Sequence, residues 1–193
     1  MEKTEFYVSL DIETDGPIPG RNSMLSLGAW AFTAAGGELG RCTINFRPLE
    51  GAVQDPTTMA WWADKPAAWA AATKDALDPT RAIANFIWWL DQLGGPHGKP
   101  IFLAWPVAFD IMFVRWYAQA LVSVNLHPII ACDIRSYLAG KLGVGLSQVV
   151  RAVPKEWDMR GHDSGVDHTH VALEDAMEQG QLFLAALQSG EKV

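Results

Sequence analysis

The chain has little of what marks a disulfide scaffold, a membrane protein or a broad nucleic-acid surface. Cysteine occurs only at Cys42 and Cys132, a pair that fits neither a metal-binding spacing nor a disulfide framework. No apolar run approaches the roughly 20 residues needed to cross a bilayer. Basic residues are also few: the chain has 15 Lys and Arg against 22 Asp and Glu, which gives a net charge of −7. This balance argues against a broad nonspecific nucleic-acid surface but leaves room for a localised site.

A secretory pattern is absent as well. Residues 1–5 lead directly into a β-prone segment, and we therefore expect a reduced, cytoplasmic protein with no membrane partner. No repeat, low-complexity tract or linker interrupts the chain. Its 193 residues and 49% hydrophobic content are typical of one globular domain, expected to span residues 1–193.

The most informative segment that is present runs from Phe6 to Thr14. Its apolar and polar residues alternate, which is typical of a β-strand. Asp11 and Glu13 are two residues apart and therefore share one face of that strand. Like charges this close repel each other unless a proton or a cation intervenes, and carboxylate oxygen suits Mg²⁺ or Mn²⁺. The pair indicates a metal site, with two unrelated acids at a solvated strand end as the ordinary alternative.

The remaining pattern predicts an α/β domain with a mixed sheet. Strands are expected over 6–14, 24–32, 39–46, 99–104 and 128–133, and helices over parts of 57–72 and over 79–93, 110–122 and 169–187. Asp78 and Pro79 are typical of a helix start, and Gly94 with Gly95 should stop that helix.

Two later acids extend the first pair. Asp110 follows the strand expected at 99–104, in the region where α/β sheets build their sites. Asp175 lies inside the last expected helix. Each has an ordinary alternative, since Asp110 could be a helix N-cap and Asp175 a surface acid beside Glu174 and Glu178.

Three short motifs, in this order, resemble those of the DEDD exonucleases, of the subclass with a catalytic His. The motifs are Asp11-Ile12-Glu13, Phe109-Asp110 and His170-x-Ala172-x-x-Asp175. The Tyr subclass would carry Tyr at position 171, where this chain has Val. The resemblance covers residues 6–187 approximately. It implies an RNase H-like fold, with a mixed central sheet flanked by helices, and 3′-5′ exonuclease activity on single-stranded nucleic acid.

The resemblance also implies a role for each motif residue. The carboxylates of Asp11, Glu13, Asp110 and Asp175 would hold two ions, Mg²⁺ or Mn²⁺, which assist phosphodiester hydrolysis. His170 would take the proton from the attacking water as general base. His168 is a competing candidate, but the spacing to Asp175 matches His170.

Smaller matches resemble oligoribonuclease and the phage-type and bacterial exoribonucleases. Residues 58–62, with Trp61 and Trp62, lie where these relatives carry a Trp-containing segment. Residues 133–136 resemble their Asp-x-Arg-Ser/Thr segment. We therefore expect RNA to be preferred over DNA, and one of the two tryptophans to stack on a terminal base. The expected substrate contacts are Thr14, Trp62 and Arg135.

Two alternatives stay open: a DNA exonuclease of the proofreading type, and a nucleic-acid-binding module without turnover. The complete acidic set and His170 argue against the module. One departure concerns Trp105-Pro106, since many relatives have Asn or Gly-rich residues there. A homodimer is implied by the family resemblance, and the adjacent Trp88 and Trp89 are a further hint of one.

Overall fold

The computed structural model describes residues 5–126, 129–157 and 169–190. Its strands are β1 (Phe6–Thr14), β2 (Met24–Phe32), β3 (Glu38–Asn45), β4 (Pro100–Ala104) and β5 (Ile130–Asp133). They form one five-stranded sheet in the order β3-β2-β1-β4-β5. Because β1 pairs antiparallel with β2 and parallel with β4, the sheet is mixed, as predicted.

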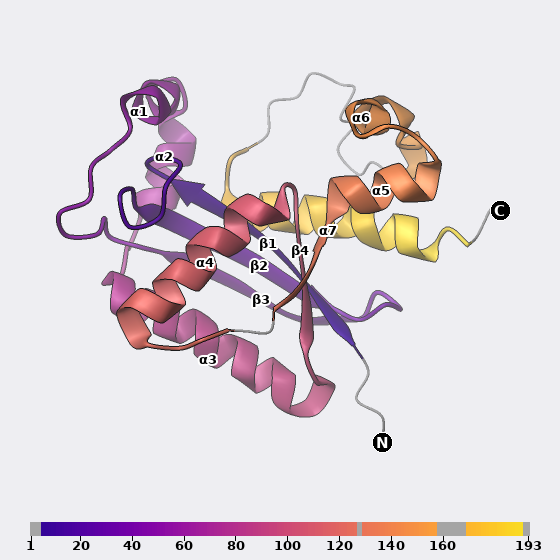
Figure 1. Cartoon of the computed structure of the whole chain (residues 1–193), viewed down its shortest axis with the longest axis horizontal. Helices are drawn as coiled ribbons and strands as arrows, with labels where there is room; N and C mark the ends of the chain where they lie inside the picture. The colour runs from indigo at the N-terminus through magenta and orange to yellow at the C-terminus, as the bar shows by residue number, and fades with distance from the viewer. Residues whose placement is uncertain (1–4, 127–128, 158–168, 191–193) are drawn as a thin grey trace.

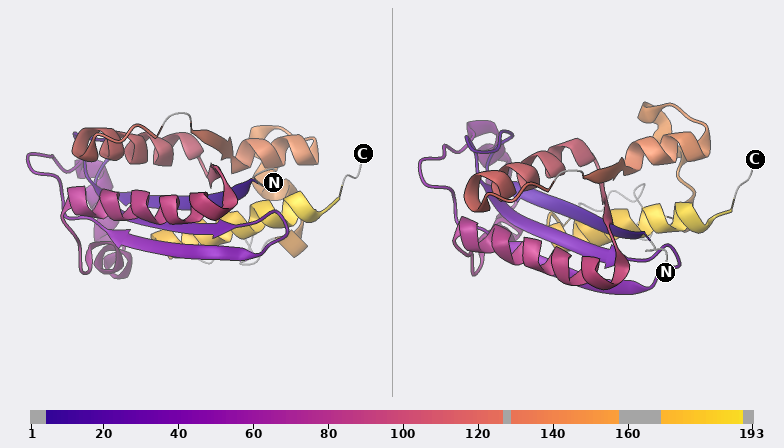
Figure 2. Two further views of the ribbon diagram at one scale, coloured as in Figure 1. Left: turned by 90° about the horizontal axis from the view of Figure 1, so that it is seen from below. Right: turned by 60° about the horizontal axis from the view of Figure 1, so that its bottom comes forward.

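Helices cover both faces of this sheet (Figures 1 and 2). They are α1 (Pro56–Ala63), α2 (Pro66–Thr73), α3 (Pro79–His97), α4 (Val107–Val122), α5 (Ile134–Leu142), α6 (Val149–Ala152) and α7 (Ala172–Gln188), with 3-10 turns at Leu146–Gln148 and Lys155–Trp157. Helices α3 and α4 pack on one face, and α7 packs on the other against β1 and β2. None of the helices in the described ranges is long and apolar enough to span a membrane.

The alternation within β1 decides which side chains meet which helix. Val8 and Leu10 are fully buried in the core shared with Phe86 of α3 and Phe113 of α4. The intervening residues therefore face α7, as the ring contact between Tyr7 and Phe183 shows. Asp11 and Glu13 belong to this second face. The strand thus delivers two carboxylates to the layer between the sheet and α7.

Two glycines allow α7 to lie close to the sheet. A Cβ atom at Gly28 of β2 would overlap the backbone of Ala172 and Leu173 at the start of α7, and Gly28 is the register partner of Asp11. Further along the helix, a Cβ atom at Gly180 would lie 2.8 Å from the Cβ atom of Ser9. The first turn of α7 is therefore held against the strand pair that carries the acidic residues.

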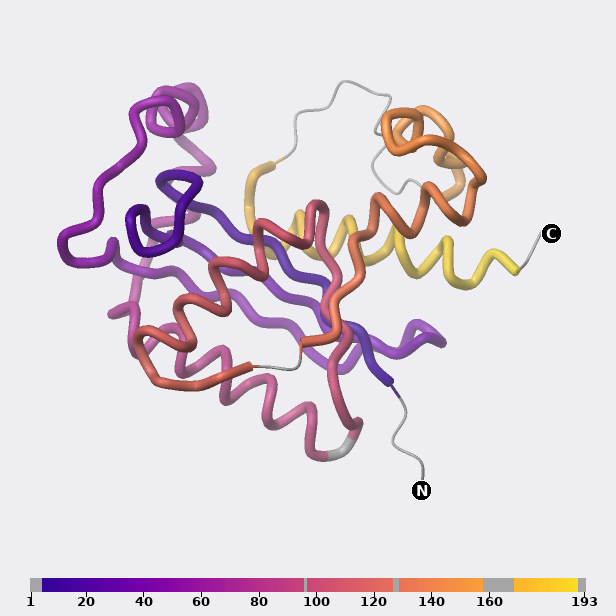
Figure 3. The backbone as a smooth tube through the Cα atoms, viewed as in Figure 1, coloured from indigo at the N-terminus to yellow at the C-terminus, as the bar shows by residue number. Residues whose placement is uncertain are grey.

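Some expected boundaries are wrong. Helix α3 continues through Gly94 and Gly95, because the turn that ends it is made at Gly98, which has a φ of 100°. Helix α4 begins at Val107 rather than at position 110. Helices α5 and α6 have no counterpart among the expected elements. In Figure 3 this α5–α6 segment and the α1–α2 segment lie at opposite ends of the upper margin of the sheet.

Candidate active site

Asp110 is joined to the end of β1 by a hydrogen bond across the fold. The backbone N–H of Ile12, between the two strand acids, donates to Oδ1 of Asp110 at 3.1 Å. Asp110 is buried, with 3% of its surface exposed. It lies within the first turn of α4 and not at the N-cap, so the N-cap alternative is wrong. Instead, Asp133 serves the start of α4, accepting from the Val107 N–H at 3.2 Å.

The start of α7 adds the other two predicted residues. His170 immediately precedes the helix with a φ of 51°, in the left-handed region that non-glycine residues rarely occupy. Asp175 lies in the first turn, where its backbone N–H donates to the Val171 carbonyl. One potential ligand atom from each of Glu13, His170 and Asp175 lies within 4.8 Å of the other two. The left-handed turn at His170 thus coincides with the point where these groups converge.

Burial and mutual repulsion favour the protonated forms of these acids. The pKa of Asp11 is raised well above its ordinary value, first by burial and then by the charges of Asp110, Glu13 and Asp175. Burial, followed by the charges of Asp175 and Asp110, raises the pKa of Glu13 to about 8. Burial also raises the pKa of Asp110 to about 8, against the lowering effect of the Ile12 N–H. Four carboxyl groups from three elements therefore form one electrostatic cluster.

This donor set fits divalent cations. Carboxylate oxygens are the ligands that hard cations such as Mg²⁺ and Mn²⁺ prefer. A bound cation would offset the repulsion that raises the pKa of Asp11 and Glu13. The geometry is compatible with this, because the ligand atoms of Glu13 and Asp175 lie within 4.8 Å of each other, and a nitrogen of His170 lies within the same distance of both.

The two adjacent tryptophans of α1 have different surroundings. Trp62 is 2% exposed, and its Nε1–H donates to the carbonyl of Thr14 at 2.9 Å. Its ring has no accessible face for a base, so the expected stacking role of Trp62 is wrong. Trp61 is 39% exposed. Its ring meets the His170 imidazole edge-to-face, with centroids 4.7 Å apart.

The other two expected substrate contacts have clear structural partners. Thr14 is buried at the irregularity that ends the pairing of β1 with β2, and its carbonyl holds Trp62. Arg135 donates from Nε to the carbonyl of Leu146 at 2.8 Å, which links α5 to the following 3-10 turn. A substrate contact by Thr14 or Arg135 stays a prediction. The competing base, His168, lies outside the described residues.

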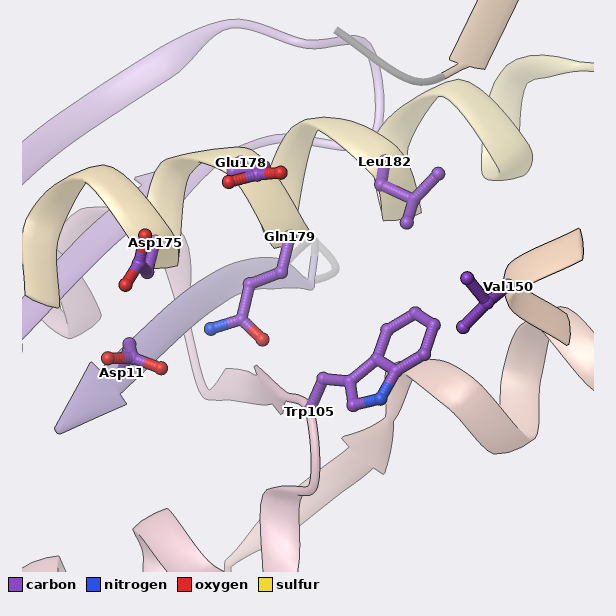
Figure 4. A pocket seen from close by; sticks show the side chains of 7 residues that line it. All are labelled: Asp11, Trp105, Val150, Asp175, Glu178, Gln179 and Leu182. Atoms are coloured by element: carbon purple, nitrogen blue, oxygen red, sulfur yellow. The ribbon is translucent and has the colours of Figure 1, made fainter. Parts of the chain in front are cut away.

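Sequence reasoning missed a group of residues that line a cavity beside the acids. Trp105, Glu178 and Gln179 share this cavity with Asp11 and Asp175 (Figure 4). A signal for two of them existed, because positions three and four after Asp175 lie on the same side of a helix. Trp105 follows β4 and had no comparable local signal.

Comparison with known proteins identifies the family of this chain. The sequence model of a family described as the 3′-5′ exoribonuclease Rv2179c-like domain matches residues 6–187. The 3′-5′ DNA exonuclease Cap18 of Escherichia coli is 27% identical over 196 residues, covering 97% of this chain and 95% of the relative.

Solved structures resemble the fold over nearly the whole chain. The Mg²⁺- and Mn²⁺-bound form of S. pombe Pop2p has a TM-score of 0.62 at 12% identity, covering 92% of this chain and 81% of that one. A 3′-exonuclease described for 3′-end-specific recognition of a histone mRNA stem-loop has a TM-score of 0.67 at 14% identity, with coverage of 96% and 64%. Together with the sheet order, these similarities confirm the predicted RNase H-like fold.

Proposed function

This chain belongs to the 3′-5′ exoribonuclease Rv2179c-like family and is a 3′-5′ exonuclease, a phosphodiester hydrolase, and from this premise we propose that it degrades single-stranded RNA with the help of two divalent cations. The observation that carries the proposal is the cluster of Asp11, Glu13, Asp110 and Asp175, in which Glu13 and Asp110 are buried and Asp11 and Asp175 are half-buried. Bringing so many acids together in one place is costly unless positive charge compensates for it. Asp11 and Asp175 of this cluster also line a cavity of about 450 Å³.

The four carboxylates would hold the cations, either Mg²⁺ or Mn²⁺. When bound, two such ions activate the attacking water and stabilise the charge that develops on the scissile phosphate and on the leaving 3′ oxygen. The residues themselves contribute position. Asp110 is fixed by the N–H of Ile12, while Asp11 and Glu13 are fixed by the pairing of β1 with β2. These restraints keep the carboxylate oxygens converged before a substrate binds.

His170 is the proposed general base. It takes the proton from the attacking water, a step that typically contributes 10²–10⁴-fold to the rate. Its ring lies beside Glu13 and Asp175, so the proton would be accepted next to carboxylates that are proposed to hold the cations. His170 is not needed as a ligand, because the four carboxylates supply the charge.

Trp61 is the proposed stacking surface for the terminal base. Its ring is 39% exposed and touches His170, so a base stacked on it lies near the general base. The ammonium group of Lys65 lies 5.3 Å from the ring centroid, and its charge favours an approaching phosphate. Stacking of one base on an aromatic side chain contributes about 1–3 kcal/mol.

DNA is the second candidate substrate, and a specific observation favours it. Cap18, which is described as a DNA exonuclease, aligns over 97% of this chain. Base stacking does not separate the two substrates, because discrimination needs a contact to the 2′-OH. The family description favours RNA, and we expect RNA to be degraded faster.

The test is digestion of 5′-labelled RNA and DNA strands of matched sequence, with and without a blocked 3′ end. We expect shortening from the 3′ end in Mg²⁺ or Mn²⁺, faster for RNA, and protection by the block. Faster loss of the DNA strand would assign DNA as the substrate. Shortening from the 5′ end of a 3′-blocked strand would contradict the proposal. Light scattering of the purified protein tests the homodimer, which stays a prediction.

A further inference from the structure

A cavity of about 450 Å³ extends from the acidic cluster along α7. Figure 4 shows Asp11 and Asp175 at one end of it. At the other end is an apolar wall formed by Trp105 of the β4–α4 connection, Val150 of α6 and Leu182 of α7. Ligand-binding cavities commonly have volumes of this order. The cavity therefore has one acidic end, which suits a phosphate only through the cations proposed above, and one end suited to a flat apolar group.

A nucleotide has the same two ends, a charged phosphate and an aromatic base. We propose that this cavity binds the base of a nucleotide that flanks the scissile phosphate, with the base against the indole of Trp105. This inference rests on the exonuclease function proposed above and adds a second base contact, separate from Trp61. Trp105 is half-buried, which lets it form a wall of the cavity while its position is held by the fold.

Two polar residues favour a base over a backbone phosphate in the apolar end. Glu178 is 8% exposed and lines the cavity one helical turn after Asp175. Its carboxylate would repel a phosphate that entered beside it. An uncharged base meets no such repulsion, and its N–H groups can donate to a carboxylate oxygen.

Gln179 supplies a second acceptor of fixed orientation. Its Nε2–H donates to the carbonyl of Leu10 at 3.0 Å. Since a carbonyl accepts only from the nitrogen end of an amide, this bond also fixes the amide oxygen. Figure 4 shows that oxygen on the side of Trp105. The middle of the cavity therefore presents acceptors that match the N–H donors on the edge of a base.

The test compares strands that are intact with strands lacking the base at the last or the next-to-last position. With wild-type protein, we expect one of these abasic strands to bind roughly 5- to 150-fold more weakly, the range for one stacked base. Trp105→Ala should impose a similar penalty on the intact strand and little further penalty on that abasic strand. Trp105→Phe should retain most of the affinity. Trp88→Ala is the matched control, because Trp88 is exposed on α3 and does not line the cavity.

Binding is measured by fluorescence anisotropy with phosphorothioate strands, and turnover separately with cleavable strands. Equal weakening of both strands by Trp105→Ala would show a purely structural role and overturn the inference. The inference is also overturned if the difference in affinity between the intact and the abasic strand is abolished by Trp61→Ala but not by Trp105→Ala. Absence of any strand shortening by the wild type would instead reject the exonuclease function, while the anisotropy comparison still decides the base site.

Discussion

The imidazole of His170 packs edge-to-face against the indole of Trp61, with ring centroids 4.7 Å apart and planes at 82°. Trp61 belongs to α1, whereas His170 directly precedes α7. The contact therefore joins two distant parts of the chain at the proposed base. It restricts the orientation of the imidazole, and it places a partly exposed aromatic face next to that imidazole.

Trp61→Ala should reduce kcat/KM by at least about tenfold, because an aromatic pair contributes about 0.5–1.5 kcal/mol and stacking of a base contributes about 1–3 kcal/mol. Steady-state kinetics on a short strand measures this effect, and thermal unfolding should change little. Trp62→Ala is the matched control: its ring is buried, and its loss should cost about 3–5 kcal/mol of folding free energy. Unchanged kinetics in Trp61→Ala would remove both of its proposed roles.

His170→Ala should lower kcat by about 10²–10⁴-fold, the usual effect of removing a general base. The increase in melting temperature on adding Mn²⁺ should persist, because His170 is not a proposed ligand. His168→Ala is the comparison, and it should keep near wild-type turnover. If His168→Ala is the inactive variant and His170→Ala is active, the base has been assigned to the wrong residue.

Stability of the metal-free protein should fall as the pH rises. Burial and neighbouring charges raise the pKa of Glu13 to about 8, and burial does the same for Asp110. In the unfolded chain both groups titrate at about 4, so between these values the folded state binds more protons. The stabilisation is complete below about pH 4 and is lost as the pH passes through about 8.

Thermal unfolding in a chelator from pH 5 to pH 9 measures this loss. We expect a fall of several degrees, since 1 kcal/mol corresponds to roughly 2–4 °C for a domain of this size. Mg²⁺ should reverse the fall by compensating the charge. Asp110→Asn can still accept the Ile12 hydrogen bond and should flatten the profile. A wild-type profile that is no steeper than that of Asp110→Asn would contradict the electrostatic coupling.

Gly28→Ala should impair both folding and turnover. A Cβ atom at this position would overlap the backbone at Ala172 and Leu173, so the start of α7 would have to move away from β2. A loss of more than about 2 kcal/mol in unfolding free energy and a strong drop in kcat are expected, as for other overpacked sites. Gly140→Ala in α5 is the control, because no atom lies within 4 Å of its added Cβ. Equal effects of the two substitutions would show that the close approach of α7 has no special importance.

Local patterns predicted much of the fold. The alternation over Phe6–Thr14 was sufficient to place β1 and to put Asp11 and Glu13 on one face, because strand geometry is set by neighbouring residues. The prediction that α3 ends at Gly94 and Gly95 was wrong, because it relied on local propensity alone. A weak helix propensity does not end a helix by itself, and α3 ends only where Gly98 adopts a positive φ.

Contacts between distant segments could not be predicted in the same way. The choice between Trp61 and Trp62 depends on the hydrogen bond from Trp62 to the Thr14 carbonyl, 48 residues away in the sequence. The cavity wall at Trp105 likewise depends on how α6 and α7 meet the β4–α4 connection. Only the spacing from Asp175 to Glu178 and Gln179 gave a local indication of that cavity.

The most direct test is a crystal structure with Mn²⁺ and a phosphorothioate strand, with the ions located by anomalous diffraction. The account predicts two Mn²⁺ peaks ligated by Asp11, Glu13, Asp110 and Asp175, with the phosphate nearest the 3′ end between them and His170. Ions and the 3′ end bound at any other surface, with these four carboxylates free of metal, would contradict it.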